Sequence, residues 1–281
     1  KQLSDIGGAV ASASVTNKVL VDGDHDELTA AFVTTGTKVT ASNAVVTFDD
    51  VANATMTAKQ LSDIGGAVAS ASVTNKILVD GDHDELTAAF VTSGTKVTAS
   101  KAVVTFDDVT NATMTAKQIS DIVGAVTSAT ITNKVAISGD VSDMTAALVT
   151  AGTSATIGTT GTTATVSDLA TLSEANAIAK INNVTASFTL GLSDSSTALT
   201  KNATTISDDM AAVTTDQSDI KITVNDAKDA TVSATRLAAI GGATTGDVTV
   251  SSAVKVTDNH DNLTAAFVTT GTKVLATSAV L

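Results

Sequence analysis

The dominant feature of this sequence is a tandem repeat with a period of 58 residues. The segment KQLSDIGGAVASASVTNK starts at Lys1 and again at Lys59, and a close variant starts at Lys117. A fixed period of this length is typical of proteins built from stacked repeats. We therefore interpret the chain as one continuous array whose fourth unit is degenerate and whose fifth is truncated. The five units are 1–58, 59–116, 117–169, 170–234 and 235–281.

Each unit divides into two segments in which the sequence predicts a strand, a short helix and a second strand. The first unit carries one such segment at 17–42, and the next begins at 53–74. The half-unit is then about 29 residues long, which is within the range of known stacked repeats. Alternation of polar and apolar residues predicts strands at 38–42 and 247–251.

The short helices are predicted from spacing and from candidate caps. Leu28 and Phe32 lie four residues apart, Asp24 is placed to cap the helix that contains them, and Gly36 is placed to end it. The cap position is conserved in chemical type along the array. It holds Asp82, Asp140 and Asn259 in the other units.

Composition points to a thin core and to strands. Hydrophobic residues make up 43% of the chain, yet aromatic residues only 2%, and there is no proline. Together with the abundance of Thr and Val, this predicts a mainly β protein: a parallel β-solenoid with short helices in each coil. The alternative is a string of separate antiparallel sandwich domains of about 58 residues, each of which would bury little apolar surface.

The segment ATMTAKQLSDIGGAVASASVT and its late copy ATVSATRLAAIGGATTGDVTVSSAV carry a family resemblance. They resemble the Thr/Ala/Val-rich repeats of giant bacterial extracellular surface proteins, such as adhesins, surface-layer proteins and filament proteins. The resemblance covers nearly the whole chain and implies secretion and a structural or adhesive role. Many of those proteins also carry calcium-binding GGxGxD arrays, which this sequence lacks.

An acidic run before two of the predicted helices is the clearest candidate site. Alternating carboxylates suit a hard cation such as Ca²⁺. An EF-hand loop counted from the first acid would need Gly and Glu where Glu27 and Val33 stand, so that motif does not fit. Helix capping is the favoured interpretation, because the cap position recurs in later units while the other acids do not. The candidate calcium residues are Asp22, Asp24, Asp26, Glu27, Asp80, Asp82, Asp84 and Glu85.

Other chemistry-bearing residues predict no enzyme. His25, His83 and His260 occupy one repeat position, where stacked units would hold them apart, so we expect exposed loop histidines and no zinc site. The sequence has no cysteine, no GxSxG and no HExxH motif. It therefore predicts no catalytic residues and no required cofactor.

Charge and hydropathy limit the partners. The net charge is −13 with a single arginine, Arg236, which argues against nucleic acid. No segment has the apolar length of a membrane helix. Both ends of the sequence fall inside a repeat unit, so we expect a piece of a longer array. Exposed strand edges at such ends predict self-association.

These patterns predict an extracellular structural protein that forms or extends a filament, sheath or surface layer. The alternative is the stalk of a large cell-surface adhesin. A third hypothesis is ice binding, from the triplets Thr55-Met56-Thr57 and Thr113-Met114-Thr115, although Thr is common on strand surfaces. Five N-x-[ST] sequons are candidates for glycosylation: Asn53, Asn111, Asn183, Asn202 and Asn262.

Overall fold

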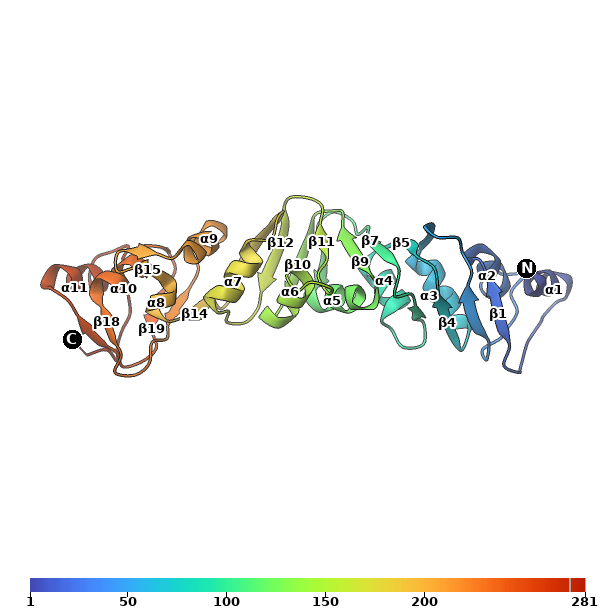
Figure 1. The fold of residues 1–281 in the computed structure, drawn as a ribbon, viewed down its shortest axis with the longest axis horizontal. Coiled ribbons are helices and arrows are strands. Elements are labelled where there is room, and N and C mark those ends of the chain that lie inside the picture. Colours follow the sequence, from blue (N-terminus) through green and yellow to red (C-terminus); the bar gives the residue numbers. More distant parts are fainter. Residues whose placement is uncertain (273, 281) are drawn as a thin grey trace. The chain divides into compact units, whose positions relative to one another are not determined.

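Helices and strands alternate along the chain in the computed structural model, which describes residues 1–272 and 274–280 (Figure 1). Helices account for 32% and strands for 28% of the chain, so the protein is mixed α/β with several parallel sheets. The prediction of a mainly β parallel solenoid is therefore wrong. Its error has a physical cause, because each capped Leu/Ala segment forms a helix of two or more turns that outweighs the short strands beside it.

The chain divides into two compact units, which are described separately. The first comprises Lys1–Val135 with Ala146–Thr160, and the second comprises Ala136–Thr145 with Gly161–Leu281. One helix, α6 (Val141–Leu148), contributes residues to both.

The first unit contains five complete helices among its described residues, each of eight to ten residues. They are α1 (Gln2–Ala9), α2 (His25–Phe32), α3 (Ala58–Ala67), α4 (His83–Phe90) and α5 (Ala116–Ala125). Its strands are short, with two to five residues each. They are β1 (Leu20–Gly23), β2 (Val45–Phe48), β3 (Ala54–Thr57), β4 (Ser70–Val73), β5 (Ile77–Gly81), β6 (Val97–Thr98), β7 (Val103–Phe106), β8 (Ala112–Thr115), β9 (Ser128–Ile131) and β11 (Thr156–Ile157).

Two parallel sheets organise the first unit, in the orders β1-β2-β4-β6 and β11-β9-β7-β5-β3. Neighbouring strands come from positions about 25 residues apart, as Leu20 pairs with Val45 and Val45 with Ser70. The parallel pairing agrees with the expectation from sequence. The spacing between paired strands is shorter than the predicted half-unit, because the two helices of a repeat are unequally spaced.

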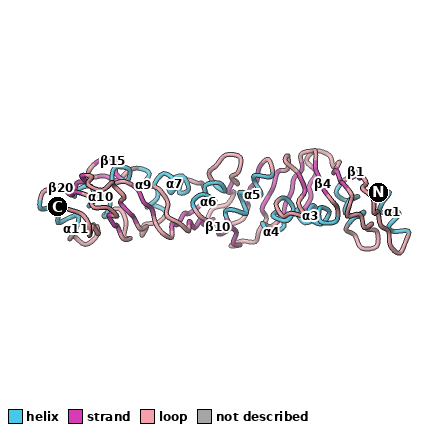
Figure 2. The backbone as a smooth tube through the Cα atoms, turned by 90° about the horizontal axis from the view of Figure 1, so that it is seen from below, coloured by secondary structure: helices cyan, strands magenta, loops and turns pink. Residues whose placement is uncertain are grey.

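The two sheets are interleaved along the sequence. The chain runs from β3 in the second sheet through α3 to β4 in the first, and then returns to β5 in the second. The same alternation continues through α4, β6 and β7, and Figure 2 shows helices and strands following one another in this way. Each sheet therefore takes strands from more than one 58-residue repeat.

The second unit contains the degenerate and truncated repeats. Its helices are α7 (Leu172–Ala179), α8 (Ser196–Leu199), α9 (Asp208–Asp216), α10 (Ala234–Gly241) and α11 (His260–Phe267). Its strands are β10 (Val135–Gly139), β12 (Thr162–Val166), β13 (Val184–Phe188), β14 (Leu192–Asp194), β15 (Thr200–Asn202), β16 (Thr205–Ile206), β17 (Ile222–Val224), β18 (Thr231–Ser233), β19 (Val248–Val250) and β20 (Lys255–Thr257). Parallel pairs join β10-β12-β13, β14-β17-β19 and β18-β20, and β15-β16 is antiparallel.

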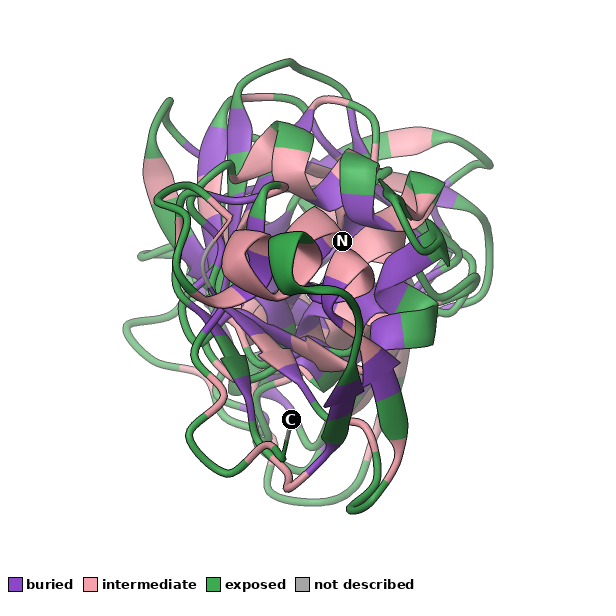
Figure 3. Ribbon diagram, turned by 90° about the vertical axis from the view of Figure 1, so that its left-hand side faces the viewer, coloured by how far each residue is buried: buried purple, intermediate pink, exposed green. Residues whose placement is uncertain are grey.

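Buried and more exposed positions alternate along the strands (Figure 3). In β5, Ile77 and Val79 are buried while the residues between them are partly exposed, as expected for strand geometry. The core is lined mainly by Ala, Val, Leu and Ile, and the few aromatic residues occupy its most enclosed positions. Phe48 and Phe106 are fully buried at the ends of β2 and β7.

The predicted helix at the acidic run is present, but its end and the following strand differ from expectation. Helix α2 ends at Phe32, and Gly36 belongs to the turn beyond it, where its φ of 97° favours glycine. Of the predicted strand 38–42, only Thr40 forms a bridge, with Ser14. The predicted strand 247–251 is present as β19.

Candidate functional site

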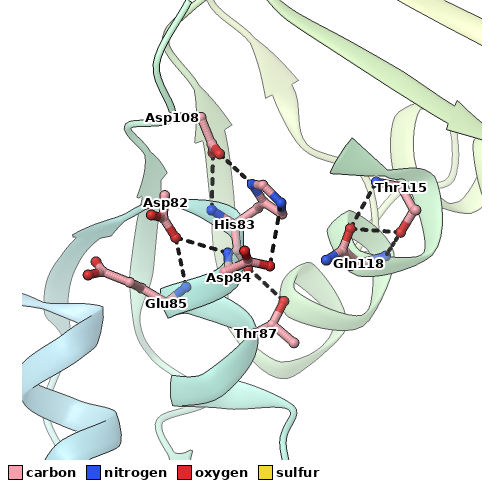
Figure 4. A network of polar contacts seen from close by, with 8 residues as sticks. All are labelled: Asp82, His83, Asp84, Glu85, Thr87, Asp108, Thr115 and Gln118. Carbon is pink, nitrogen blue, oxygen red and sulfur yellow. Dashed lines mark hydrogen bonds and ion pairs between the residues drawn. The ribbon is translucent and has the colours of Figure 1, made fainter. Parts of the chain in front are cut away.

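The acidic run of the second repeat lies where β5 leads into helix α4 (Figure 4). Asp82 is the N-cap, and its Oδ1 accepts hydrogen bonds from the backbone N–H groups of Asp84 at 3.0 Å and Glu85 at 2.8 Å. In the first repeat Asp24 accepts from the N–H of Glu27 at 2.8 Å. The structure thus shows the capping hydrogen bonds at both runs, which satisfy N–H groups that have no partner inside the helix.

A second carboxylate reaches the same helix end from a later part of the chain. Asp108 follows β7 and is only 3% exposed. Its Oδ2 accepts from the backbone N–H of His83, the first residue of α4, at 3.1 Å, and its Oδ1 contacts the His83 Nδ1 (Figure 4). The first repeat has the same arrangement, with Asp50 at 3.1 Å and 2.5 Å from the corresponding atoms of His25.

This contact between a later aspartate and a helix start recurs in the second unit. The N–H of the first or second helical residue again donates to an aspartate more than twenty positions ahead. The contacts are Val141 to Asp168 (2.7 Å), Leu172 to Asp194 (3.2 Å), Ser196 to Asp226 (2.9 Å) and Thr235 to Asp258 (3.1 Å). A helix N-terminus carries partial positive charge, so each carboxylate compensates the helix dipole as well as the free N–H.

The histidines differ from one another, although they occupy one repeat position. The His25 and His83 side chains are 19% and 18% exposed, so the expectation of exposed histidines is wrong for these two. The His260 side chain is 90% exposed and contacts Asp261 at 3.0 Å. Its repeat position has no later aspartate within the described part of the chain, which explains the difference.

Carboxylates crowd around the start of α4. Burial raises the pKa of Asp107, and the neighbouring charges of Asp80, Asp108 and Asp82 raise it further. Burial also raises the pKa of Glu85, with additional repulsion from Asp82 and Asp107. The cluster is therefore an electrostatically unfavourable arrangement of like charges at neutral pH.

Hydrogen bonds have the opposite effect at two other helix starts. The side chain of Asn262 and then Thr235 hold the pKa of Asp258 far below its usual range. The backbone N–H of Asp143 lowers the pKa of Asp140. These carboxylates are stabilised in their ionised form.

The candidate calcium residues do not gather into one cluster of ligands. Asp26 and Asp84 are 80% exposed and contact the Nε2 of the neighbouring histidine at 3.4 and 3.5 Å. Glu27 lies 3.7 Å from the amino group of Lys1. Within residues 1–272 and 274–280, no group of three or more His, Asp or Glu side chains is placed to hold a metal ion. Calcium binding stays a prediction.

A surface hollow of about 310 Å³ lies beside the first aspartate contact, lined by Asp24, His25, Asp26, Asp49 and Asp50 among others. The His83 ring of the second repeat contacts only carboxylates among the side-chain interactions described, at Asp108 and Asp84. A histidine held in this way positions and neutralises acids. Nucleophilic catalysis would need a hydroxyl at the ring as well.

The other residues singled out in the sequence have structural surroundings of their own. Thr55 and Thr57 are exposed on β3, whereas Thr113 and Thr115 are exposed on β8, outside the sheet that contains β3. Three sequon asparagines adopt left-handed backbone conformations, in which Asn is favoured among the residues that have a side chain. They are Asn53 (φ 66°), Asn111 (68°) and Asn183 (69°).

Three capping boxes were missed in the sequence. The Thr57 side chain accepts from the N–H of Gln60, and the Gln60 side chain accepts from the N–H of Thr57 at 2.9 Å. Thr115 with Gln118 (Figure 4) and Thr171 with Glu174 form the same reciprocal pair. The signal was present, because Thr-x-x-Gln and Thr-x-x-Glu before a helix are capping-box sequences.

Comparisons with protein-family models, curated proteins and solved structures gave no match to this chain. Among the described helices, none has the length and apolar character required to cross a bilayer.

Proposed function

We propose that this chain is a structural repeat protein of an extracellular surface, which forms or extends a filament, sheath or surface layer through contacts between repeats. The observation that carries the proposal is the recurrence of one contact along the array. Six helix starts, from His25 to Thr235, each bond to an aspartate of a later segment. A contact that recurs at each step suits an array that is extended by adding units.

The use of polar groups also supports a structural role. Asn75 donates its side-chain N–H to the carbonyl of Asp50 at 2.8 Å, and Asn133 does the same to Asp108 at 2.7 Å. Conspicuous polar residues of the repeat are thereby engaged in holding one segment of chain to another. The extracellular placement rests on the resemblance of the repeats to those of bacterial surface proteins, and Ca²⁺ binding at the acidic runs belongs to the same proposal.

Electron microscopy and light scattering of the purified chain test the proposal. A filament or layer subunit is expected to give fibres or sheets whose mass grows with protein concentration. A chain that stays monomeric at high concentration in sedimentation experiments contradicts the filament role and favours the adhesin stalk.

A further inference from the structure

Strand β1 (Leu20–Gly23) pairs with β2 on one edge only within the described part of the chain. Beside its other edge lies a groove of about 410 Å³ between β1, α1 and α2. The groove is lined largely by apolar side chains, including Leu3, Ile6 and Val21. Ile6 is 55% and Leu20 is 72% exposed, which is unusual for large apolar residues of a repeat core.

The second repeat shows the same surface in a covered state. The residues that correspond to Leu3 and Ile6, 58 positions later, are Leu61 and Ile64, and both are fully buried. The strand that corresponds to β1 is β5, which pairs with β7 on one edge and with β3 on the other. In this repeat, therefore, β3 lies on the edge that is open in the first.

The way in which β3 lies there defines the chemistry of the covering segment. Met56 is 2% exposed and pairs with Val79, the counterpart of Val21. Ala58 lies so close to Gly81 that a β-carbon on the glycine would be 2.7 Å from the alanine Cβ. The alternate residues of β3 are exposed threonines. The covering segment thus has the pattern Ala-Thr-Met-Thr-Ala, with Met inward and Thr outward.

We infer that the groove between α1 and β1 is an acceptor site for an extended polypeptide segment of this pattern. The segment adds as a parallel strand to β1, with its Met beside Val21 and its last Ala at Gly23. Backbone hydrogen bonds supply affinity, and the Met pocket supplies specificity. The partner is a second repeat polypeptide in which such a segment is not paired in a sheet of its own. The inference rests on the proposed function in one respect, since it names the segment by which repeat chains join.

The test uses the full chain and a blocked peptide with the sequence of residues 51–58, VANATMTA. Amide hydrogen exchange of Leu20–Asp22 is expected to slow by about tenfold or more at saturating peptide, because new inter-strand hydrogen bonds protect these groups. A peptide carrying Met56→Asp is expected to give no protection. Fusion of residues 47–58 directly before Lys1 raises the effective concentration and is expected to protect the same amides without added peptide.

Two matched protein variants distinguish the groove from general surface binding. Ile6→Lys changes a side chain that is exposed in the free chain, so folding should be retained, yet its counterpart Ile64 is fully buried under the covering strand. We expect this variant to lose peptide protection. Val109→Lys changes a side chain that is 77% exposed and does not line the groove, and should bind as the parent does.

The outcomes separate this inference from the proposed function. Unprotected β1 amides in the fusion, or equal protection by the Met56→Asp peptide, overturn the acceptor site. If fibres nevertheless form, the structural role stands and a different surface joins the chains. If the peptide protects β1 but no fibres form under any condition, the acceptor site stands and the filament role is contradicted.

Discussion

Asp108 holds His83 at two points, because one carboxylate oxygen accepts the backbone N–H of His83 and the other contacts its ring. Since Asp108 is buried, Asp108→Ala leaves both groups without this partner. We expect a loss of about 1–3 kcal/mol in the free energy of unfolding, measured by urea denaturation followed by circular dichroism. The matched control is Asp84→Ala at a side chain that is 80% exposed, for which the loss should be about 0.5 kcal/mol or less. Equal losses in the two variants would contradict the structural importance of the Asp108 contact.

Adjacent glycines in α3 offer a test of how closely the segments pack. A β-carbon on Gly65 would lie 2.0 Å from the carbonyl oxygen of Thr95, whereas one on Gly66 would lie 3.4 Å from a methyl group of the same residue. Gly65→Ala should therefore destabilise the protein by about 1–3 kcal/mol through overpacking. Gly66→Ala should be neutral or should stabilise by about 0.5–1 kcal/mol, because alanine favours the helix. Thermal unfolding of the two variants decides, and similar midpoints would disprove the predicted contact.

The crowded carboxylates at α4 predict a pH dependence. The pKa values of Asp107 and Glu85 are raised in the folded state, so the folded state binds these protons more tightly than the unfolded state. Their contribution to stability is present below the pKa of the unfolded carboxyls and is lost as the pH rises through the higher folded values. Asp107→Asn should therefore increase stability at pH 7 and reduce the change between pH 7 and pH 4, as measured by urea unfolding at each pH.

Asp229→Asn is the matched control for that experiment. Asp229 is exposed and has a left-handed φ of 65°, a conformation in which asparagine stands at three other turns of this chain. The substitution removes one charge at a distance from the α4 cluster in the sequence and should leave the pH profile unchanged. A parallel shift in both variants would point to net charge as the cause.

Chelation tests the calcium hypothesis directly. Asp82 already uses one carboxylate oxygen to cap α4, and Asp84 is directed to His83 at 3.5 Å. We therefore expect the unfolding temperature to be the same with chelator as with added Ca²⁺. A fall on chelation that disappears in Asp107→Asn would show that the cation relieves the repulsion within the cluster.

Local features of the fold could be predicted from the sequence where neighbouring residues decide them. Asp24 followed by Leu28 and Phe32 was sufficient to predict α2 and its cap, and the alternation around Val248 was sufficient for β19. The fold class was predicted wrongly because Thr and Val content was given more weight than the helix-forming segments. Thr57 and Gln60 show that cap signals were available for a helix that was predicted only from its spacing.

The candidate site depends on contacts that a repeat period does not reveal. His25 meets Asp50 and His83 meets Asp108, each 25 residues ahead, whereas the sequence divides into half-units of a different length. Only the parallel pairing of β1 with β2 and of β5 with β7 places these residues together. Pairing register is a tertiary property, so the histidines were expected in solvent although two of them are held by buried acids.

The interleaving of the two sheets in the first unit bears on how such an array changes length during evolution. Residues 20–98 build one sheet and residues 54–157 build the other, so a 58-residue repeat has no boundary at which a sheet ends. Recombination that removes one whole period, from any position to its equivalent, reconnects strands to neighbours of the same sequence. Removal of half a period instead joins a helix to the wrong strand and strands an aspartate from its histidine. Copy number is thus free to drift in steps of one period, while shorter deletions are penalised.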